Sequence, residues 1–117
     1  MSPERRFAPR YQLIAEAEVR EIDSNTLHKA KTGDLSVGGC FLDMLNPSPK
    51  DTVVRVTIFR ECGTLTTDGR VAFVLPNLGM GVAFTDIARD QSATLEKWIA
   101  ELGAGLPGPQ FRPGVRL

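Results

Sequence analysis

Two short stretches near the start of the chain carry the residue types best suited to binding chemistry. The first is RRFAPRY, residues 5–11, which holds the three arginines Arg5, Arg6 and Arg10. A guanidinium group is a planar fork that binds phosphate through two hydrogen bonds and also stacks on flat rings. Three such groups on one short segment suit a ligand that carries both phosphates and bases. The alternative is a solvated basic segment with no ligand.

The second stretch is GDLSVGGCF, residues 33–41. The carboxylate of Asp34 can accept hydrogen bonds from the N–H groups of a base such as guanine, and the hydroxyl of Ser36 can donate or accept a hydrogen bond. Gly38 and Gly39 permit positive φ and leave room for a ligand to approach the backbone. The alternative is an ordinary turn, in which Asp34 and Ser36 bond their own backbone. This stretch alone leaves both interpretations open.

Other candidate motifs fail on inspection. GMGVAF, residues 79–84, begins like a dinucleotide fingerprint, but its sixth position is Phe84 and no βαβ pattern surrounds it. A nucleophile elbow needs glycine two residues before Ser36, where this chain has Asp34. The single histidine, His28, lacks a Cys or His cluster, so we expect a solvated strand residue and no metal site. The sequence therefore predicts a protein that is not an enzyme.

Composition limits the kind of anion site to expect. The chain has 117 residues, enough for one domain with a modest core, and its formal net charge is zero. Proteins that bind nucleic acid polymers through bulk electrostatics are usually strongly basic. We therefore expect a local anion site, with no DNA or RNA polymer as a partner.

Cysteine spacing and the first residues bear on the compartment. Cys40 and Cys62 form neither a CxxC pair nor a disulfide framework, and we expect both to be small hydrophobes within strands. Residues 1–10 are polar and charged, unlike a signal peptide. No apolar run approaches the ~18 residues that span a bilayer. The sequence thus predicts a cytoplasmic protein without membrane insertion.

Alternating apolar and polar residues predict the elements that must position the two stretches. In 12–22 and again in 52–60 the alternation has period two, which indicates half-buried strands. Six such strands at hairpin spacing favour a sandwich or barrel. They are residues 12–22, 26–35, 38–45, 52–60, 63–75 and 80–84.

The last periodic segment has helical spacing. Its apolar residues fall at i, i+3, i+4 and i+7, one stripe of an α-helix, and are Leu95, Trp98, Ile99 and Leu102. We expect the helix to begin near Asp90, to end with Gly103 at the C′ position, and to pack its Trp98 face on the barrel.

Proline and glycine set the domain plan. Pro9 excludes a regular helix, so we expect residues 1–11 to form an irregular ligand-binding arm. Residues 12–102 are expected to form the barrel and its closing helix. Residues 103–117 hold four glycines and three prolines, which predicts a flexible tail.

Taken together, the two stretches resemble a known family. RxxxR at Arg6 and Arg10, followed about two dozen residues later by DxSxxG at Asp34, Ser36 and Gly39, is similar to the motif pair of the PilZ family of cyclic di-GMP receptors. The stretches DGRVAFV and MGVAFTDI look like that family's later strands. The resemblance covers about residues 4–102.

The resemblance implies a fold and a set of contacts. The fold would be all-β, a six-stranded antiparallel β-barrel with one C-terminal α-helix. Arg6 and Arg10 would contact phosphate and guanine, Asp34 and Ser36 would hold the polar edge of guanine, and Gly38 and Gly39 would keep the loop close to the ligand. Arg5 would accompany a stacked dimer of the ligand. Apart from cyclic di-GMP itself, no cofactor is implied.

The resemblance also implies a role, and it leaves alternatives open. A single-domain bacterial receptor would relay second messenger signals to a separate, unidentified downstream protein when the ligand orders residues 1–11. The pathway, whether motility, exopolysaccharide or virulence, is not implied. One alternative is a PilZ-like adaptor that binds no nucleotide. Another is a barrel for single-stranded nucleic acid, which needs exposed aromatics, whereas Tyr11 and the phenylalanines are predicted mostly in core positions.

Overall fold

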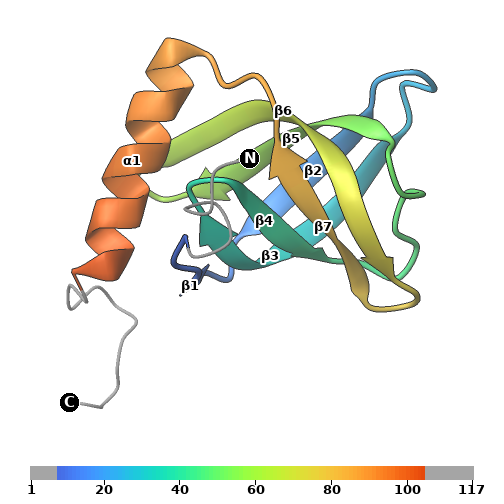
Figure 1. Ribbon diagram of the computed structural model, residues 1–117, viewed down its shortest axis with the longest axis horizontal. Helices are drawn as coiled ribbons and strands as arrows, with labels where there is room; N and C mark the ends of the chain where they lie inside the picture. The colour runs from blue at the N-terminus through green and yellow to red at the C-terminus, as the bar shows by residue number, and fades with distance from the viewer. Residues whose placement is uncertain (1–7, 105–117) are drawn as a thin grey trace.

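The computed structural model describes residues 8–104, which contain seven strands and one helix (Figure 1). The elements are β1 (Tyr11–Gln12), β2 (Glu16–Glu21), β3 (Leu27–Ser36), β4 (Gly39–Asp43), β5 (Val53–Arg60), β6 (Gly63–Leu75), β7 (Gly79–Phe84) and α1 (Arg89–Gly103). Within residues 8–104, no helix combines the length and the apolar character needed to cross a membrane.

The strands close into a barrel. Hydrogen bonding runs in the order β3, β2, β5, β6, β7 and β4, and β4 pairs back onto β3, with every pairing antiparallel. The short β1 pairs with β3 beyond the end of β2. The predicted six-stranded antiparallel barrel with one C-terminal helix is therefore confirmed.

The core is built from the inward positions of the strands. On β5, the buried side chains of Val54, Val56 and Ile58 alternate with more exposed neighbours, which is the pattern of a half-buried strand. The helix α1 lies across one end of the barrel and buries Leu95 and Trp98 against it (Figure 1). The predicted apolar stripe of the helix is thus confirmed.

The end of α1 differs from the prediction. Gly103 is the last helical residue, and the C-cap is Ala104 in right-handed geometry, with φ −76° and ψ −9°. Gly103 therefore does not serve as a left-handed C′ residue. A Cβ atom there would lie 3.0 Å from the hydroxyl oxygen of Tyr11, so the glycine instead allows β1 to approach the helix closely.

The predicted strand 12–22 is interrupted. Residues 13–15 lie outside the ladders, between β1 and β2. The buried hydroxyl of Thr32 replaces the missing backbone partners: it accepts a hydrogen bond from the Ala15 amide at 2.9 Å and donates one to the Leu13 carbonyl. A polar residue inside the core thus fixes where the strand breaks.

Two bulges change which side chains face outward. On β3, Gly33 and Asp34 together oppose Phe41 of β4, so Gly33 is an extra residue in the ladder. On β6, Ala72 is the extra residue opposite β7. Because side chains alternate along a strand, one extra residue moves every later side chain to the other face. The bulges therefore turn Asp34 and Phe73 toward the outside of the barrel.

Two minor predictions need correction. Cys62 is exposed in the turn between β5 and β6, so it is not a small hydrophobe within a strand. His28 lies on a strand as expected, but its Nε2 is 3.0 Å from Oε2 of Glu21 and its side chain is only 25% exposed. Cys40, by contrast, is buried, and burial raises the pKa of its thiol to about 12.

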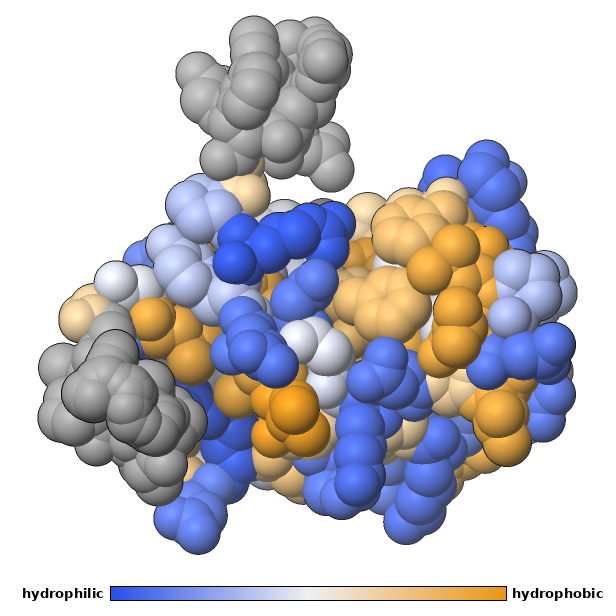
Figure 2. Space-filling view, turned by 90° about the horizontal axis from the view of Figure 1, so that it is seen from below, coloured by the Kyte–Doolittle hydropathy of each residue, from blue (hydrophilic) through white to orange (hydrophobic). Residues whose placement is uncertain are grey.

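Apolar side chains also lie outside the core. The face seen from below shows hydrophobic residues gathered on the part away from α1, beside strongly hydrophilic ones (Figure 2). The turn between β6 and β7 points toward this side (Figure 1). Its flanking residues Leu75 and Leu78 are 43% and 65% exposed. The barrel surface near β6 and β7 is thus partly apolar.

Candidate functional site

The two sequence stretches meet because β1 pairs with β3. Tyr11 lies opposite Leu35, so the preceding residue, Arg10, lies beside the end of β3 that carries Asp34. The Arg10 Nη1 donates hydrogen bonds to both carboxylate oxygens of Asp34, at 3.1 and 3.2 Å. Diagonal neighbours in paired strands are within reach of long side chains. Short-range pairing therefore joins two residues that are 24 positions apart.

This ion pair remains open to solvent. The side chain of Arg10 is 56% exposed and that of Asp34 is 30% exposed. Surface pairs of this kind contribute about 0–1 kcal/mol to stability. A ligand that offers better partners to both groups can therefore separate them at little cost.

The turn after β3 is organised by Ser36. Its hydroxyl accepts a hydrogen bond from the Gly38 amide at 3.2 Å and donates one to the Gly39 carbonyl at 3.3 Å. Ser36 is 7% exposed. Of the two interpretations of this residue, these hydrogen bonds are those of the self-bonded turn. Asp34, in contrast, makes its side-chain bonds to Arg10.

The two glycines of the turn do not use the positive φ that was expected of them. Neither adopts positive φ; among residues 8–104 Gly63 is the only glycine that does. A Cβ atom at Gly39 would overlap the Val82 carbonyl oxygen, so Gly39 permits close strand packing. A Cβ atom at Gly38 would meet nothing within 4 Å, so the space beside Gly38 is open.

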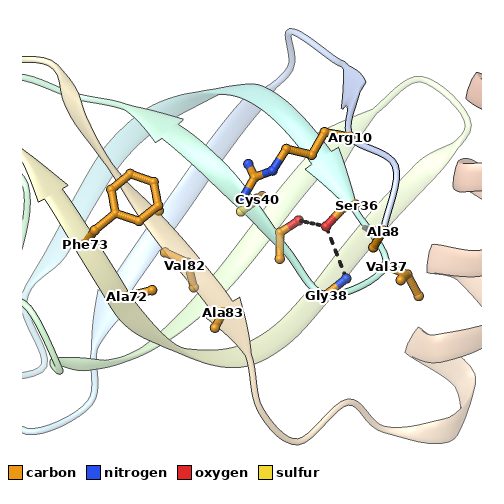
Figure 3. A pocket seen from close by; sticks show the side chains of 12 residues that line it. Ala8, Arg10, Ser36, Val37, Gly38, Cys40, Ala72, Phe73, Val82 and Ala83 are labelled. Carbon is orange, nitrogen blue, oxygen red and sulfur yellow. Dashed lines mark hydrogen bonds between the residues drawn. The ribbon is translucent and has the colours of Figure 1, made fainter. Parts of the chain in front are cut away.

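A pocket of about 360 Å³ lies at this corner of the barrel (Figure 3). Four of the predicted site residues line it, Arg10, Ser36, Gly38 and Gly39, together with parts of β4, β6 and β7. The close view places the Arg10 guanidinium above the strands and the Phe73 ring to one side. The pocket thus combines a cation, backbone groups of a turn and an apolar wall.

The remaining predicted cations cannot be placed. Arg5 and Arg6 lie outside the described residues 8–104, so the geometry of the full RxxxR motif is not defined. Most of the expected flexible tail, residues 105–117, lies outside the described residues as well. The roles of Arg5, Arg6 and the tail remain predictions.

Phe73 has the largest side chain among the pocket residues that the sequence analysis did not predict. Phe73 lines the pocket and is 40% exposed, although it was expected in the core. Phe59 is similarly exposed, at 38%, so the expected core position is wrong for both Phe59 and Phe73, whereas Phe84 packs against the core. A glycine within a strand is a signal for a bulge, but Ala72 gives none. Phe73 could not have been found from the alternation alone.

The thiol at the pocket floor is not a reactive group. Cys40 lines the pocket between Arg10 and the strands but is 2% exposed. Burial, and after it the Asp34 carboxylate, raise the pKa of the thiol to about 12, and Arg10 opposes this rise. Because the thiolate is the nucleophile, Cys40 acts here as a small apolar side chain.

Comparisons with known proteins bear on the family and the fold of this chain. The family model described as PilZ domain matches residues 4–101. No curated protein matches the sequence. Among solved structures, the PilZ domain of CeSA from a cellulose-synthesizing bacterium has 20% identity and a TM-score of 0.67, and the match covers 82% of this chain and 99% of that one.

Two further matching structures are described as containing c-di-GMP. The PilZ domain of YcgR from Escherichia coli, with c-di-GMP, has 13% identity and a TM-score of 0.70, with 86% of this chain and 92% of that chain covered. The MrkH–c-di-GMP complex from K. pneumonia has 19% identity and a TM-score of 0.73, with 88% and 54% covered. The present chain thus spans about half the length of MrkH.

At these identities the structural likeness establishes the fold, while the family model matches most of the sequence. Both agree with the barrel and the closing helix described above. The chain belongs to the PilZ domain family.

Proposed function

We propose that this protein is a receptor for cyclic di-GMP that binds the nucleotide at the pocket beside Arg10 and Asp34. The observation that carries the proposal is the meeting of Arg10, Asp34 and the turn of residues 36–39 at one corner of the barrel. Relatives of the same fold, YcgR and MrkH, are described in complex with this nucleotide. The protein acts as a binding module, without a chemical reaction.

The chemistry of the ligand matches the groups at the corner. Cyclic di-GMP has two phosphates and two guanines. Arginine binds the O6 and N7 atoms of guanine through two hydrogen bonds, worth about 1–3 kcal/mol, and it binds phosphate through charge-assisted ones. The Asp34 carboxylate accepts hydrogen bonds from the N1–H and N2–H groups of guanine. The nucleotide therefore offers both Arg10 and Asp34 a new hydrogen-bonding partner in place of each other.

The turn supplies the space for the ligand. The region beside Gly38 is open, and Gly39 holds the turn against β7. A larger side chain at Gly38 would occupy the volume that a base or ribose needs. In this proposal Ser36 keeps the turn in shape and offers its hydroxyl to the ligand's edge.

Arg5 and Arg6 complete the cationic side of the site in the proposal. Together with Arg10 they neutralise a ligand that has two negative charges, and Arg5 favours a stacked dimer of it. Calorimetry tests this stoichiometry. Two nucleotides per protein support the stacked form, and one nucleotide per protein removes it.

The relay follows from the position of the arm. In this proposal the ligand neutralises Arg5 and Arg6 and fixes them against the barrel beside Arg10, a disorder-to-order switch of the arm. The surface remade in this way is recognised by a separate downstream protein in the cytoplasm. The competing proposal, an adaptor that binds no nucleotide, predicts a partner complex that is indifferent to cyclic di-GMP.

A titration with cyclic di-GMP tests the proposal. We expect micromolar or tighter binding by the wild type and its loss in Arg6→Ala and Asp34→Ala. Arg55→Ala is the matched control, because Arg55 forms a similarly exposed pair with Asp68 at 2.8 Å on β5 and β6. A single-stranded oligonucleotide should not bind. Equal affinity of the four proteins for cyclic di-GMP, or none, would refute the proposal.

A further inference from the structure

An aromatic wall borders the pocket on the side of β6. Phe73 is 40% exposed and lines the pocket, and its ring packs on that of Phe41, with centroids 6.1 Å apart and 24° between the planes. Phe41 lies directly opposite Asp34 in the β3–β4 ladder. The two rings therefore extend outward from the same corner that holds the ion pair.

The position of the Phe73 ring depends on two backbone features. The bulge at Ala72 turns Phe73 to the outer face of β6, where it lies opposite Gly81 of β7. A Cβ atom at Gly81 would overlap the Phe73 ring. The ring thus lies over the backbone of Gly81, in the space that a side chain at position 81 would occupy.

We propose that Phe73 stacks on a purine base of the bound nucleotide, and that Gly81 is the positioning residue that seats its ring. This inference rests on the proposed function. The close view shows the Phe73 ring and the Arg10 guanidinium on different sides of the pocket, with the strands below (Figure 3). A flat base placed there contacts the ring while its polar edge reaches Arg10 and Asp34.

The stacking contact explains recognition of a base in addition to phosphate. Aromatic side chains that stack on bases typically account for about fivefold to about 150-fold in affinity when replaced by alanine. A phosphate-only ligand would gain nothing from such a wall. The ligand class assigned to this surface is therefore a nucleotide, and the proposed function makes its base a purine.

Titration of the whole chain with cyclic di-GMP tests the stacking. We expect Phe73→Ala to weaken binding by about fivefold to about 150-fold, and Phe73→Tyr to restore it. Phe59→Ala is the matched control, because Phe59 is 38% exposed but does not line the pocket, and it should bind like the wild type. Wild-type affinity in Phe73→Ala overturns this inference and leaves the proposed function standing. No binding by the wild type overturns both.

The positioning of the Phe73 ring by Gly81 is tested without any ligand. In the wild type, nuclear Overhauser contacts should join the rings of Phe41 and Phe73, and in Gly81→Ala they should weaken as the Phe73 ring is displaced. If Gly81→Ala unfolds, the double variant Gly81→Ala with Phe73→Ala should fold again, since the overlap is removed. Unchanged ring contacts in Gly81→Ala, or a double variant less stable than Gly81→Ala, would refute the positioning role.

Discussion

Two arginine–aspartate pairs on this barrel are nearly alike and have different surroundings. Arg10 and Asp34 are 56% and 30% exposed, and Arg55 and Asp68 are 54% and 34% exposed. Both pairs join neighbouring segments of the sheet. Arg10 of the first pair lines a pocket together with an open glycine turn and an aromatic ring, whereas neither Arg55 nor Asp68 lines that pocket. The difference teaches that the surroundings of a charged pair, more than its charges, make a binding site.

Exchanging the charges within each pair gives the sharpest test of this comparison. In Arg10→Asp with Asp34→Arg the ion pair can re-form, but the cation and the acceptor have changed places. We expect cyclic di-GMP affinity to fall by about a hundredfold or more, about 2.7 kcal/mol. Arg55→Asp with Asp68→Arg should bind normally. Isothermal titration calorimetry measures both, and an equal loss in the two swaps would break the comparison.

A half-buried carboxylate, Glu21, extends the comparison to a group that is less exposed than either pair. Glu21 accepts hydrogen bonds from Ser48 at 2.6 Å, Ser24 at 2.8 Å and His28 at 3.0 Å. Ser48 is 2% exposed, so Ser48→Ala removes a buried bond to a charged group. We expect a loss of about 1.5–3 kcal/mol in the free energy of unfolding. Denaturant titration measures it, and ligand affinity should stay unchanged, unlike in the Arg10 swap.

The same carboxylate predicts a pH dependence of stability. The hydrogen bond from Ser48, and then those from Ser24 and His28, hold the pKa of Glu21 below its ordinary value. Since the unfolded chain then binds more protons, this stability is complete above the ordinary glutamate pKa of about 4.3 and is lost as the pH falls through the lowered value. Denaturation between about pH 7 and about pH 3 should show a smaller acid loss in Ser48→Ala than in the wild type. An identical loss in both would contradict the role of Ser48.

The smallest effect is expected on the stability of the two exposed pairs. Arg10→Ala and Arg55→Ala should each change the free energy of unfolding by less than about 1 kcal/mol, because exposed pairs contribute little. Thermal unfolding at low and high salt measures this. A large loss in Arg10→Ala alone would mean that this pair supports the fold instead of serving a ligand.

The fold was largely predictable because its strands alternate and its helix has a clear stripe. The strand 52–60 and the residues Leu95 and Trp98 lie as their spacing predicted. The break at residues 13–15 was not predictable, since it depends on the hydroxyl of Thr32, which comes from a distant strand. The role predicted for Gly103 at the end of α1 was wrong, because this glycine makes room for the Tyr11 side chain.

The candidate site was predictable only as far as its motif. Local chemistry left Asp34 and Ser36 open between a ligand role and a turn, and the family resemblance favoured the ligand role. Alternation alone would place Asp34 in line with the buried Thr32, and Phe73 in line with the buried Val71. The bulges reverse both, and a bulge is set by pairing between strands. Period-two alternation therefore cannot predict which face of the sheet a side chain takes after a bulge.

The most direct test of the central claim is a titration of the labelled protein with cyclic di-GMP, followed by backbone amide chemical shifts. The account predicts the largest shifts at Gly38, Gly39 and the residues beside Arg10, and none at Arg55 or Asp68. Shifts spread equally over both arginine–aspartate pairs, or no shifts at saturating ligand, would contradict it.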